Sequence, residues 1–432
     1  MPLEEKPKDL LSIVTETIVG RTKEDYEKFG NIATGYIGKH IVGTGEDAHL
    51  TTKVFIDLLK PHVILVSGKR GSGKSYSAAV ILEEFLLLPE EFRQKMSFVV
   101  FDPVGIYWSM KFPNEAQLQL LNSWQLEPKG FDNIKVYVPE KQLVEYEKAE
   151  IPVDGTISIS LSDLTAEDLI LAFNLERTNE LAVTLEKNFN SLLESKKVFG
   201  LDDLIDSITS DTKAKKETKD ALTSLLSVLS QWGIIKKEGT KVNELIKPGE
   251  VVVFDFSRLK SQEVRTLVAG LITREVLHQR ILSRKEEEIA KITGEQLKIK
   301  FPITWLIFEE AHNFVPSDRD VSSSADIKRV AKEGREPGVG LIVITQMPSK
   351  IHQDILSQTD LVISFRLTSK DDLQALHSVM QTYVQEELEK YLNRLPRIPG
   401  SAILLDDNLE KIFTVNIRPR ISHHAGGTAR VV

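Results

Sequence analysis

The stretch "HVILVSGKRGSGKS" at residues 62–75 decides the fold of this chain. Its first half is a continuous apolar run rich in valine and isoleucine, which is typical of a strand buried on both faces. Its second half, Gly68 to Ser75, matches the pattern G-x-x-x-x-G-K-[ST], and a helical pattern follows at once. Glycines in such a loop let backbone N–H groups surround phosphate oxygens at a helix N-terminus. The stretch therefore predicts a strand, a phosphate-binding loop and a helix in succession.

This loop predicts ATP and Mg²⁺ as cofactors. We expect Lys74 to reach the β and γ phosphates and the Ser75 hydroxyl to ligate Mg²⁺. The other residues expected around the nucleotide are Gly68, Lys69, Arg70, Gly71, Ser72, Gly73 and Tyr76. Lys69 and Arg70 add positive potential but could equally be solvated, and a glycine-rich turn without a ligand is the alternative for the whole loop. The strand before the loop and the helix after it disfavour that alternative.

A second apolar run, "ITWLIFEE" at 303–310, ends in two adjacent carboxylates. Like charges repel, and they are costly to desolvate near a core, so the pair needs a function. A nucleotide with Mg²⁺ needs a carboxylate on a neighbouring strand, and hydrolysis needs a group that orients water. We therefore expect Glu309 to hold Mg²⁺ through water and Glu310 to polarise the attacking water. Gln346, which ends the run "GLIVITQ" at 340–346, is expected to sense the γ phosphate, although a glutamine that merely opens a loop is the alternative.

The same region suggests a rival metal site. Glu309 and His312 form E-x-x-H, and so do Glu275 and His278 in "REVLHQR". Two such motifs with two further glutamates build a di-iron site in a helical bundle. All the ligands of such a site lie on helices, whereas the run before Glu309 predicts a strand, and the phosphate loop would stay unexplained. We therefore favour the nucleotide site.

Further apolar runs alternate with helical patterns along the chain. They lie at 97–103, 251–257, 361–367 and 401–407, and helical spacing appears between several of them, for example at 263–282. Strands that alternate with helices indicate an α/β fold with a mostly parallel sheet. The predicted fold class is therefore α/β, with the phosphate loop in its core.

The signal changes at about Ser162, where helical patterns that continue to Trp232 indicate a helical insertion. The predicted organisation is a small N-terminal β-rich element, a first core segment with the phosphate loop, the insertion, a second core segment, and a C-terminal strand and tail, at residues 1–60, 61–161, 162–245, 246–410 and 411–432. The charged segment 283–300 is expected to be a solvated excursion. The tail is expected to be a mobile or docked terminus; His423 and His424 in it could bind a metal, but a solvated tail is the favoured interpretation over a metal site.

Composition limits the possible partners and compartments. The 432 residues carry a formal net charge of −8, so nucleic acid would have to meet a local basic patch rather than the bulk surface. Cysteine is absent, which excludes disulfides and thiolate metal sites. The N-terminus lacks the apolar region of a signal peptide, and no apolar run approaches the roughly 18–20 residues of a membrane span. We therefore expect a cytoplasmic protein with no membrane partner.

Longer stretches carry a resemblance to a known family. They are "LSDLTAEDLI" at 161–170, "WLIFEEAHNFVP" at 305–316, "EGREPGVGLIVITQMPSKIHQDILSQTDLVISFRL" at 333–367 and "VNIRPRISHH" at 415–424. Together these motifs resemble the HerA branch of the FtsK–HerA superfamily. The resemblance implies a RecA-like P-loop NTPase core in a homohexameric ring that translocates on double-stranded DNA with ATP. It also implies a NurA-like nuclease or another effector as partner, in DNA end processing or antiviral defence.

The chain departs from the family pattern at three points. Members commonly carry an acid in the motif D-P-x-G-E-Y, whereas "DPVGIY" at 102–107 has Ile106 in its place. Glu309 stands where many members have aspartate, and its side chain is one methylene longer. The N-terminal stretch is short for the family's β-barrel domain, so residues 1–60 are expected to be a reduced version of it.

Ring ATPases usually place an arginine against the γ phosphate of a neighbouring subunit, and two arginines are candidates. Arg335 precedes the strand that ends in Gln346, so we expect it at the edge opposite its own phosphate loop. There it could serve a neighbour or a DNA phosphate. Arg366 lies near the nucleotide-side end of its strand and could act in its own site or at the interface. A surface arginine without such a role is the alternative for each.

Three functional hypotheses follow. The first is an ATP-driven translocase on double-stranded DNA, for which Lys328, Arg329 and Lys332 form a candidate basic stripe on one helix, with an ordinary solvated face as the alternative. The second is a ring that binds ATP mainly to assemble and regulate an effector. A small-molecule phosphotransferase is disfavoured, because it has less need of the glutamate strand and the glutamine.

Overall fold

The structure is a computed structural model that describes residues 16–43, 47–195, 198–295, 300–367, 369–379, 391–392 and 395–427. The strands are β1 Thr17–Val19, β2 Thr34–Val42, β3 His49–Asp57, β4 Val63–Ser67, β5 Met96–Asp102, β6 Ile134–Pro139, β7 Gly155–Ile157, β8 Ile159–Ser160, β9 Ile235–Lys236, β10 Val251–Asp255, β11 Ile303–Phe308, β12 Val339–Thr345, β13 Leu361–Ser364, β14 Ser401–Asp406 and β15 Lys411–Ile417. The α-helices are α1 Lys23–Phe29, α2 Lys74–Leu87, α3 Glu90–Arg93, α4 Leu118–Ser123, α5 Leu143–Lys148, α6 Ala166–Ala172, α7 Glu180–Ser195, α8 Leu201–Ser210, α9 Lys216–Trp232, α10 Val242–Leu245, α11 Gln262–Thr293, α12 Ser324–Glu333, α13 Gln353–Leu356 and α14 Lys370–His377.

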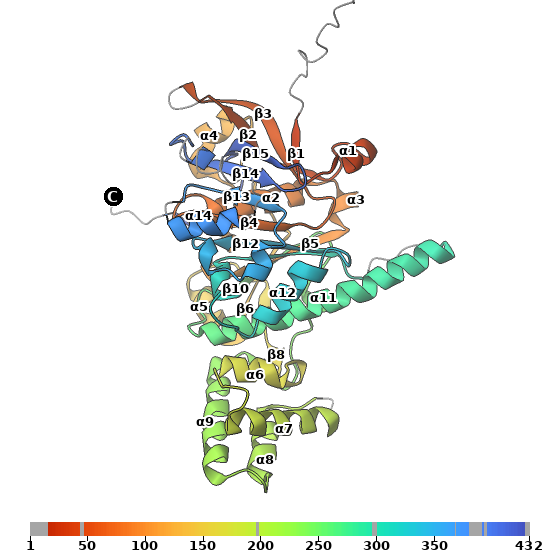
Figure 1. Cartoon of the computed structure of the whole chain (residues 1–432), viewed down its shortest axis with the longest axis vertical. Coiled ribbons are helices and arrows are strands. Elements are labelled where there is room, and N and C mark those ends of the chain that lie inside the picture. The colour runs from red at the N-terminus through yellow and green to blue at the C-terminus, as the bar shows by residue number, and fades with distance from the viewer. Residues whose placement is uncertain are drawn as a thin grey trace, which may run out of the picture.

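A parallel sheet forms the centre of the molecule (Figure 1). Its strands lie in the order β13-β4-β12-β11-β5-β10-β6-β7, and each neighbouring pair is parallel. The apolar runs that predicted strands in the sequence form β4, β5, β10, β11, β12, β13 and β14. Layers cover both faces of this sheet, which is why its strands are continuous apolar runs rather than alternating ones. The predicted α/β class with a mostly parallel sheet is confirmed.

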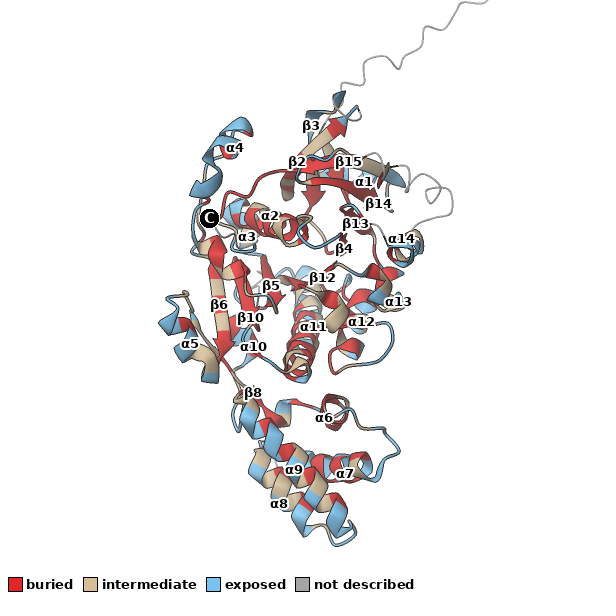
Figure 2. Ribbon diagram, turned by 90° about the vertical axis from the view of Figure 1, so that its left-hand side faces the viewer, coloured by how far each residue is buried: buried red, intermediate tan, exposed pale blue. Residues whose placement is uncertain are grey.

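The two faces of the sheet enter two separate apolar clusters. Alternate residues of β4, such as Leu65 and Val66, belong to different clusters because successive side chains of a strand point to opposite faces. The cluster on one face contains the apolar side of α2, and the cluster on the other contains α11 and α12. Figure 2 shows the central strands buried between these layers. The sheet therefore holds the carboxyl ends of its parallel strands rigidly at one edge.

The N-terminal strands continue the same sheet. The order β1-β3-β2-β15-β14 extends it beyond β13, mostly through antiparallel pairs. β2 pairs with β15 through residues such as His40 and Val415, so the described part of the N-terminal region depends on the C-terminal strand for its position. The sequence led us to expect a separate element at 1–60. The structure differs because the edge of a sheet offers unpaired backbone groups that β15 and β2 satisfy for each other.

The helical insertion projects from one end of the core. α6, α7, α8 and α9 form a module below the sheet in Figure 1. The short parallel pair of β8 and β9 stands where the chain enters and leaves it. Leu185, Leu204 and Leu226, from α7, α8 and α9, are fully buried in one cluster that continues to α11. The division of the chain at 161/162 and 245/246 stays a prediction.

α11 is longer than its sequence pattern. It runs from Gln262 to Thr293, so the charged segment 283–300 is helical over more than half of its length. Its outer half extends away from the body (Figure 1) and carries i,i+4 ion pairs such as Arg284 Nη2–Glu288 Oε1 at 2.6 Å. Among the described residues, no helix is both long enough and apolar enough to cross a membrane.

A buried histidine joins the N-terminal strands to the core. His62 Nδ1 lies 2.6 Å from Asp360 Oδ2, and its Nε2 lies 3.4 Å from Asp57 Oδ2. Arg21 Nη2 also donates to Asp57, at 2.5 Å. Burial alone would lower the pKa of His62, but the hydrogen bonds and charges of the two aspartates outweigh it and raise this pKa to about 8. The imidazolium is therefore part of the folded structure.

This network predicts a pH dependence of stability. The pKa of His62 is about 8 in the folded chain, against about 6.5 in the unfolded chain. Protonation of His62 therefore stabilises the folded state fully below pH 6.5, and this stabilisation is lost as the pH rises through 8. We expect the contribution of His62 to the free energy of unfolding to fall by about 2 kcal/mol over that window. Chemical denaturation between pH 6 and 9, with His62→Gln as the matched variant, measures it. Equal pH slopes for the two proteins would contradict the prediction.

Candidate functional site

The phosphate loop follows β4 and leads directly into α2. Its glycines have positive φ, which other residues rarely adopt, and Gly68 is also restricted by space, because a Cβ there would lie 2.6 Å from Phe365 Cβ. Lys74 begins α2, and its Nζ donates to the Lys69 carbonyl oxygen at 2.9 Å. Burial lowers the pKa of Lys74, while the nearby charges of Glu309 and Glu310 oppose that shift. The lysine is thus a buried cation bent back over its own loop.

The first glutamate of the pair meets the loop. Ser75 Oγ donates to Glu309 Oε1 at 2.6 Å, and Tyr107 OH donates to Glu309 Oε2 at 2.9 Å. Glu309 is 1% exposed, and burial raises its pKa to about 7, although both hydrogen bonds act to lower it. A serine hydroxyl in contact with a carboxylate is the oxygen donor set that Mg²⁺ prefers. The residues predicted as metal ligands, Ser75 and Glu309, therefore fit the ion.

The second glutamate is held differently. Glu310 adopts φ 52° and ψ 49°, a left-handed conformation that is uncommon outside glycine and is often found at functional sites. Gln346 Nε2 donates to Glu310 Oε1 at 2.7 Å, and His312 Nδ1 lies 3.6 Å from Oε2. His312 Nδ1 is also 3.1 Å from the Thr345 hydroxyl. Glu310 and Gln346, predicted from two separate runs, are thus in direct contact, with His312 beside them.

The loop after β5 supports Glu309 from behind. The Asp102 carboxylate accepts hydrogen bonds from the backbone N–H groups of residues 104–107, at 2.7–3.1 Å. Burial and the neighbouring Asp255 raise the pKa of Asp102 to about 7. These bonds fix the turn that presents Tyr107 to Glu309. Ile106, which replaces the acid of the family motif, is 7% exposed and packs in the apolar core.

The loops that follow the two strands lie against each other. Pro316 and Ile351 form an antiparallel bridge, the Ser317 N–H donates to the Lys350 carbonyl oxygen at 2.9 Å, and the His352 N–H donates to Val315 at 3.0 Å. One loop begins at Glu310 and the other at Gln346. We call residues 315–320 and 347–352 together the loop pair. Glu310 and Gln346, where the two loops begin, are in contact, and Pro316 pairs with Ile351 further along. The two loops are therefore one connected unit.

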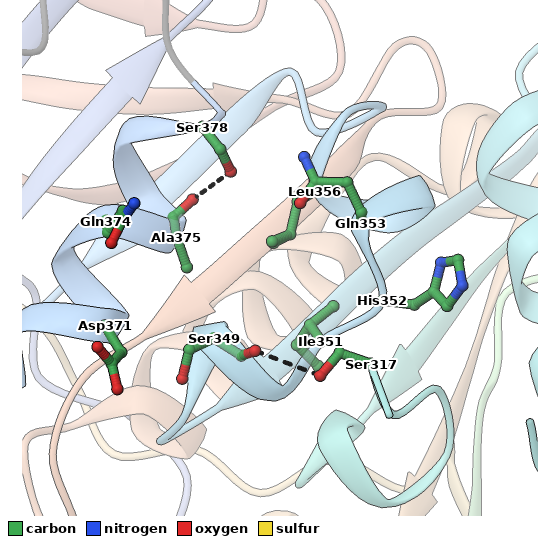
Figure 3. A pocket seen from close by; sticks show the side chains of 10 residues that line it. All are labelled: Ser317, Ser349, Ile351, His352, Gln353, Leu356, Asp371, Gln374, Ala375 and Ser378. Atoms are coloured by element: carbon green, nitrogen blue, oxygen red, sulfur yellow. Dashed lines mark hydrogen bonds between the residues drawn. The ribbon is translucent and has the colours of Figure 1, made fainter. Parts of the chain in front are cut away.

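A pocket of about 390 Å³ opens between the loop pair, α13 and α14 (Figure 3). Its lining includes Ser317, Ser349, and Asp371 and Gln374 of α14. Ser317 Oγ donates to the Ser349 carbonyl oxygen at 3.4 Å. None of residues 68–75 lines it, nor does Glu310 or Gln346, so the pocket is separate from the phosphate loop and the glutamate pair.

The arginine candidates lie far apart. Arg366 is exposed beside its own phosphate loop, where its carbonyl oxygen accepts from the Lys69 N–H at 3.4 Å. Its Nη2 donates to the Leu395 carbonyl oxygen at 3.0 Å. Arg335 is exposed and precedes β12, whereas Gln346 follows it, so a strand length of roughly 20 Å separates them. Their roles at a subunit interface stay predictions.

The basic stripe on α12 is neutralised by acids. Lys328 pairs with Asp320 at 2.8 Å, Arg329 with Glu333 at 2.8 Å, and Lys332 with Asp354 at 2.7 Å. The sequence indicated three cations on one face but could not show that two of their partners come from other segments.

The di-iron arrangement does not form. Glu309 follows a strand, while Glu275 and His278 lie on α11, and a bundle site needs all its ligands on helices. Within the described part of the chain, no cluster of three or more histidine, aspartate or glutamate side chains could hold a metal ion.

Sequence reasoning missed several residues of the site. Tyr107 was noticed only as part of a motif, and His312 only in a rival metal site. His424 was assigned to a solvated tail, yet its ring lies 5.3 Å from that of Tyr76, edge to face. The Tyr107–Glu309 and Tyr76–His424 contacts join segments more than two hundred residues apart, which no local pattern reveals, although the motifs "DPVGIY" and "VNIRPRISHH" did mark the segments.

The Tyr107–Glu309 hydrogen bond predicts a shift in a pH profile. Tyr107→Phe removes a donor that lowers the pKa of Glu309, so this pKa should rise further above 7. Mg²⁺ needs the carboxylate form, and the pH at which Mg²⁺-dependent binding of the ATP analogue AMPPNP is half-maximal should rise by about one unit. Calorimetric titrations from pH 5.5 to 9 measure it. Tyr26→Phe, at an exposed tyrosine, is the control, and a midpoint shared by all three proteins would contradict the prediction.

Comparison with known proteins finds a family of helicases that this chain resembles. Residues 36–276, more than half of the chain, match the family model described as "Helicase HerA, central domain". A DNA double-strand break repair helicase HerA of Sulfurisphaera tokodaii is 26% identical over 81% of this chain and 63% of the relative. The probable helicase MJECL08 of Methanocaldococcus jannaschii is 26% identical over 90% of this chain and 71% of its own length. The chain thus covers less than two thirds of the first of these relatives.

Two solved structures share the fold. VirB4 of Thermoanaerobacter pseudethanolicus superposes with a TM-score of 0.51 at 13% identity, over 89% of this chain and 97% of that one. The bacterial conjugative coupling protein TrwBdeltaN70 does so with a TM-score of 0.51 at 14% identity, over 90% and 94%. At this identity they support the α/β architecture alone. Since the family model covers more than half of its length, this protein belongs to the family described as "Helicase HerA, central domain".

Proposed function

We propose that this protein is an ATPase that drives translocation on double-stranded DNA. The observation that carries the proposal is the arrangement at one edge of the sheet, where Ser75 contacts Glu309 and Gln346 contacts Glu310. A phosphate loop, a metal-binding acid, a second acid and a polar residue on the strand between them are the parts that nucleotide hydrolysis requires. Relatives named as DNA double-strand break repair helicases support DNA as the partner.

Each of these residues has a distinct task. Lys74 and the loop N–H groups bind the β and γ phosphates of ATP, and Ser75 and Glu309 hold Mg²⁺, which neutralises phosphate charge. Glu310 orients the attacking water. Gln346 donates a hydrogen bond to Glu310 when no nucleotide is bound, and Gln346 contacts the γ phosphate when ATP is bound. The left-handed backbone conformation of Glu310 is of the kind that is retained at functional sites, and its carboxylate is in contact with Gln346.

The active assembly that we propose is a homohexameric ring, in which an arginine completes the neighbouring site. Arg335, at the edge opposite its own phosphate loop, suits a role in trans. Arg366, which borders its own loop and donates to Leu395 in the same chain, suits a role in cis. A NurA-like nuclease or another effector is the proposed partner, in DNA repair or antiviral defence. This part of the proposal rests on the motifs of the sequence.

The loop pair is the proposed contact with DNA. Arg319, Met347 and Lys350 on it are exposed, and Arg319 and Lys350 have no ion-pair partner among the residues that the structure describes. The α12 cations, in contrast, are each paired with an acid. The loop pair also holds Asp318 and Asp320, so its formal net charge is zero, and Asp320 is paired with Lys328. In six copies, Arg319 and Lys350 would be the groups that contact phosphate, independently of sequence and with a dependence on salt.

Steady-state hydrolysis tests the function. We expect long linear double-stranded DNA to stimulate ATP hydrolysis strongly, and Glu310→Gln to lower the stimulated rate at least about 100-fold while AMPPNP still binds, because the amide cannot polarise water. Phosphate release with and without DNA measures this. Hydrolysis that no DNA concentration changes would contradict a motor and favour a ring that scaffolds an effector. Undiminished hydrolysis in Glu310→Gln would remove that residue from the chemistry.

Charge neutralisation tests the loop pair. Arg319→Gln combined with Lys350→Gln should weaken DNA binding, and it should flatten the dependence of log K on log salt by about one for each phosphate that the two cations neutralise. Neutralising Lys328, Arg329 and Lys332 to glutamine is the matched comparison, and we expect it to act less because those charges already have partners. Fluorescence anisotropy across a salt series measures both. A larger effect on α12 than on the loop pair would contradict this assignment.

A further inference from the structure

The C-terminal segment 418–425, which we call the strap, lies across the outside of α2. Arg418 is fully buried and donates to Glu83 Oε2 at 2.7 Å and to Glu84 Oε1 at 2.6 Å. The N–H groups of Ile421 and Ser422 also donate to Glu83, at 3.2 and 2.8 Å. An ion pair with this many supporting hydrogen bonds fixes the strap to the helix that starts at the phosphate loop.

The other side of the strap is fixed to the segment after Tyr107. The Asn114 side chain donates to the Arg420 carbonyl oxygen at 2.8 Å, and its N–H donates to Ile421 at 2.9 Å. Ser109 Oγ lies 3.0 Å from the His423 carbonyl oxygen and accepts from the Ala425 N–H at 3.2 Å. The strap therefore fills the space between α2 and the segment that supports Glu309.

The end of the strap gathers around Tyr76, the residue after Ser75. The Arg420 N–H donates to Tyr76 OH at 2.6 Å, and Tyr76 OH donates to Gln117 Oε1 at 3.1 Å. The His424 ring meets the Tyr76 ring at 5.3 Å and 81°. Arg420 Nη1 lies 3.0 Å from His424 Nδ1, which fixes the ring orientation.

The His424 ring has the properties of a stacking surface. It is half-buried rather than solvated. Burial and the adjacent Arg420 charge lower its pKa to about 4, so the ring is neutral near pH 7. Arg420 Nη1 meets the edge of this ring at Nδ1, and Arg420 Nε is buried without a hydrogen-bond partner in the described part of the chain, 3.7 Å from Glu83 Oε1. A flat neutral ring that a guanidinium holds at its edge is a surface on which a nucleotide base can stack.

The direction of a bound nucleotide leads to this cluster. With the γ phosphate at Glu310 and Gln346, the phosphate chain follows the loop N–H groups toward the first turn of α2. The sugar and base then leave on the side of Tyr76. We propose, on the basis of the function proposed above, that His424, with Tyr76 and Gln117 beside it, forms the base-binding wall of the nucleotide site and stacks on the purine ring. The tail histidine is thus a nucleotide contact rather than a metal ligand.

A pair of probes separates the base from the phosphates. The full-length chain is titrated calorimetrically with AMPPNP and with inorganic tripolyphosphate, which has no base. His424→Ala should weaken AMPPNP binding about tenfold, as removal of one aromatic ring from a stacked base does, and leave tripolyphosphate binding unchanged. His424→Phe keeps a ring and should stay within about twofold of the wild type for AMPPNP.

Two further variants serve as controls. His423→Ala, next to His424 and without a side-chain bond to the strap among the described residues, should bind both probes as the wild type does. Lys74→Ala should bind neither probe. Thermal unfolding of every variant checks that it is folded.

Each remaining result would overturn the inference. Equal weakening of both probes in His424→Ala would mean that the strap acts on the phosphate loop instead. Weakening in His424→Phe as large as in His424→Ala would assign the effect to the bond with Arg420. Unchanged AMPPNP binding would remove His424 from the site. A wild-type chain that binds neither probe would refute the proposed function together with the inference, whereas the other outcomes leave that function standing.

Discussion

The contact between Ser75 and Glu309 is the interaction on which the rest of the site depends. It joins the N-terminus of α2 to the end of β11 at 2.6 Å, across the intervening strand β12. Because β4, β12 and β11 are neighbours and parallel, the residues after their carboxyl ends must meet at one edge. Gln346 follows the middle strand and so lies within reach of Glu310. The topology, rather than any single motif, brings these side chains together.

A buried acid at this contact requires compensation, and the surrounding structure supplies it. Glu309 receives two hydroxyl donors, and its raised pKa shows that they only partly offset burial. Asp102 takes four backbone N–H groups, and that turn in turn places Tyr107. On the outer side of α2, Glu83 is matched by Arg418 and by the strap backbone. A divalent cation at Glu309 would complete this neutralisation, which is a physical reason to expect metal and nucleotide to tighten the site together.

The sequence could predict what depends on local pattern. Continuous apolar runs such as 62–68 and 303–308 indicated parallel strands, and the glycine spacing at 68–75 indicated the loop, because burial on both faces and a phosphate-binding turn each impose a local composition. β6 was missed because its side chains alternate between buried and half-buried, with Lys135 and Tyr137 partly exposed. The continuity of the N-terminal strands with the core sheet was not foreseen, because their pairing with β15 involves residues almost four hundred positions away.

Long-range charge pairing was also hidden from the sequence. The α12 stripe looked basic, but Lys328 and Lys332 find acids in neighbouring segments. The sequence left open whether the tail is mobile or docked, and the buried side chains of Arg418 and Arg420 show that residues 418–425 are docked on the core. Burying an unpaired guanidinium costs too much desolvation free energy, so a buried arginine implies an acidic partner. Only the fold identifies that partner.

The departure at Ile106 follows from the same electrostatic constraint. Its side chain is buried in the core next to a turn whose N–H groups are already taken by Asp102. Asp102, Asp255 and Glu309 are all buried, and the charge of Asp102 already acts on Glu309. A fourth buried carboxylate at this point would add repulsion without a free donor to offset it. An apolar residue at 106 is therefore compatible with the buried acid at 309, whose two oxygens accept from Ser75 and Tyr107.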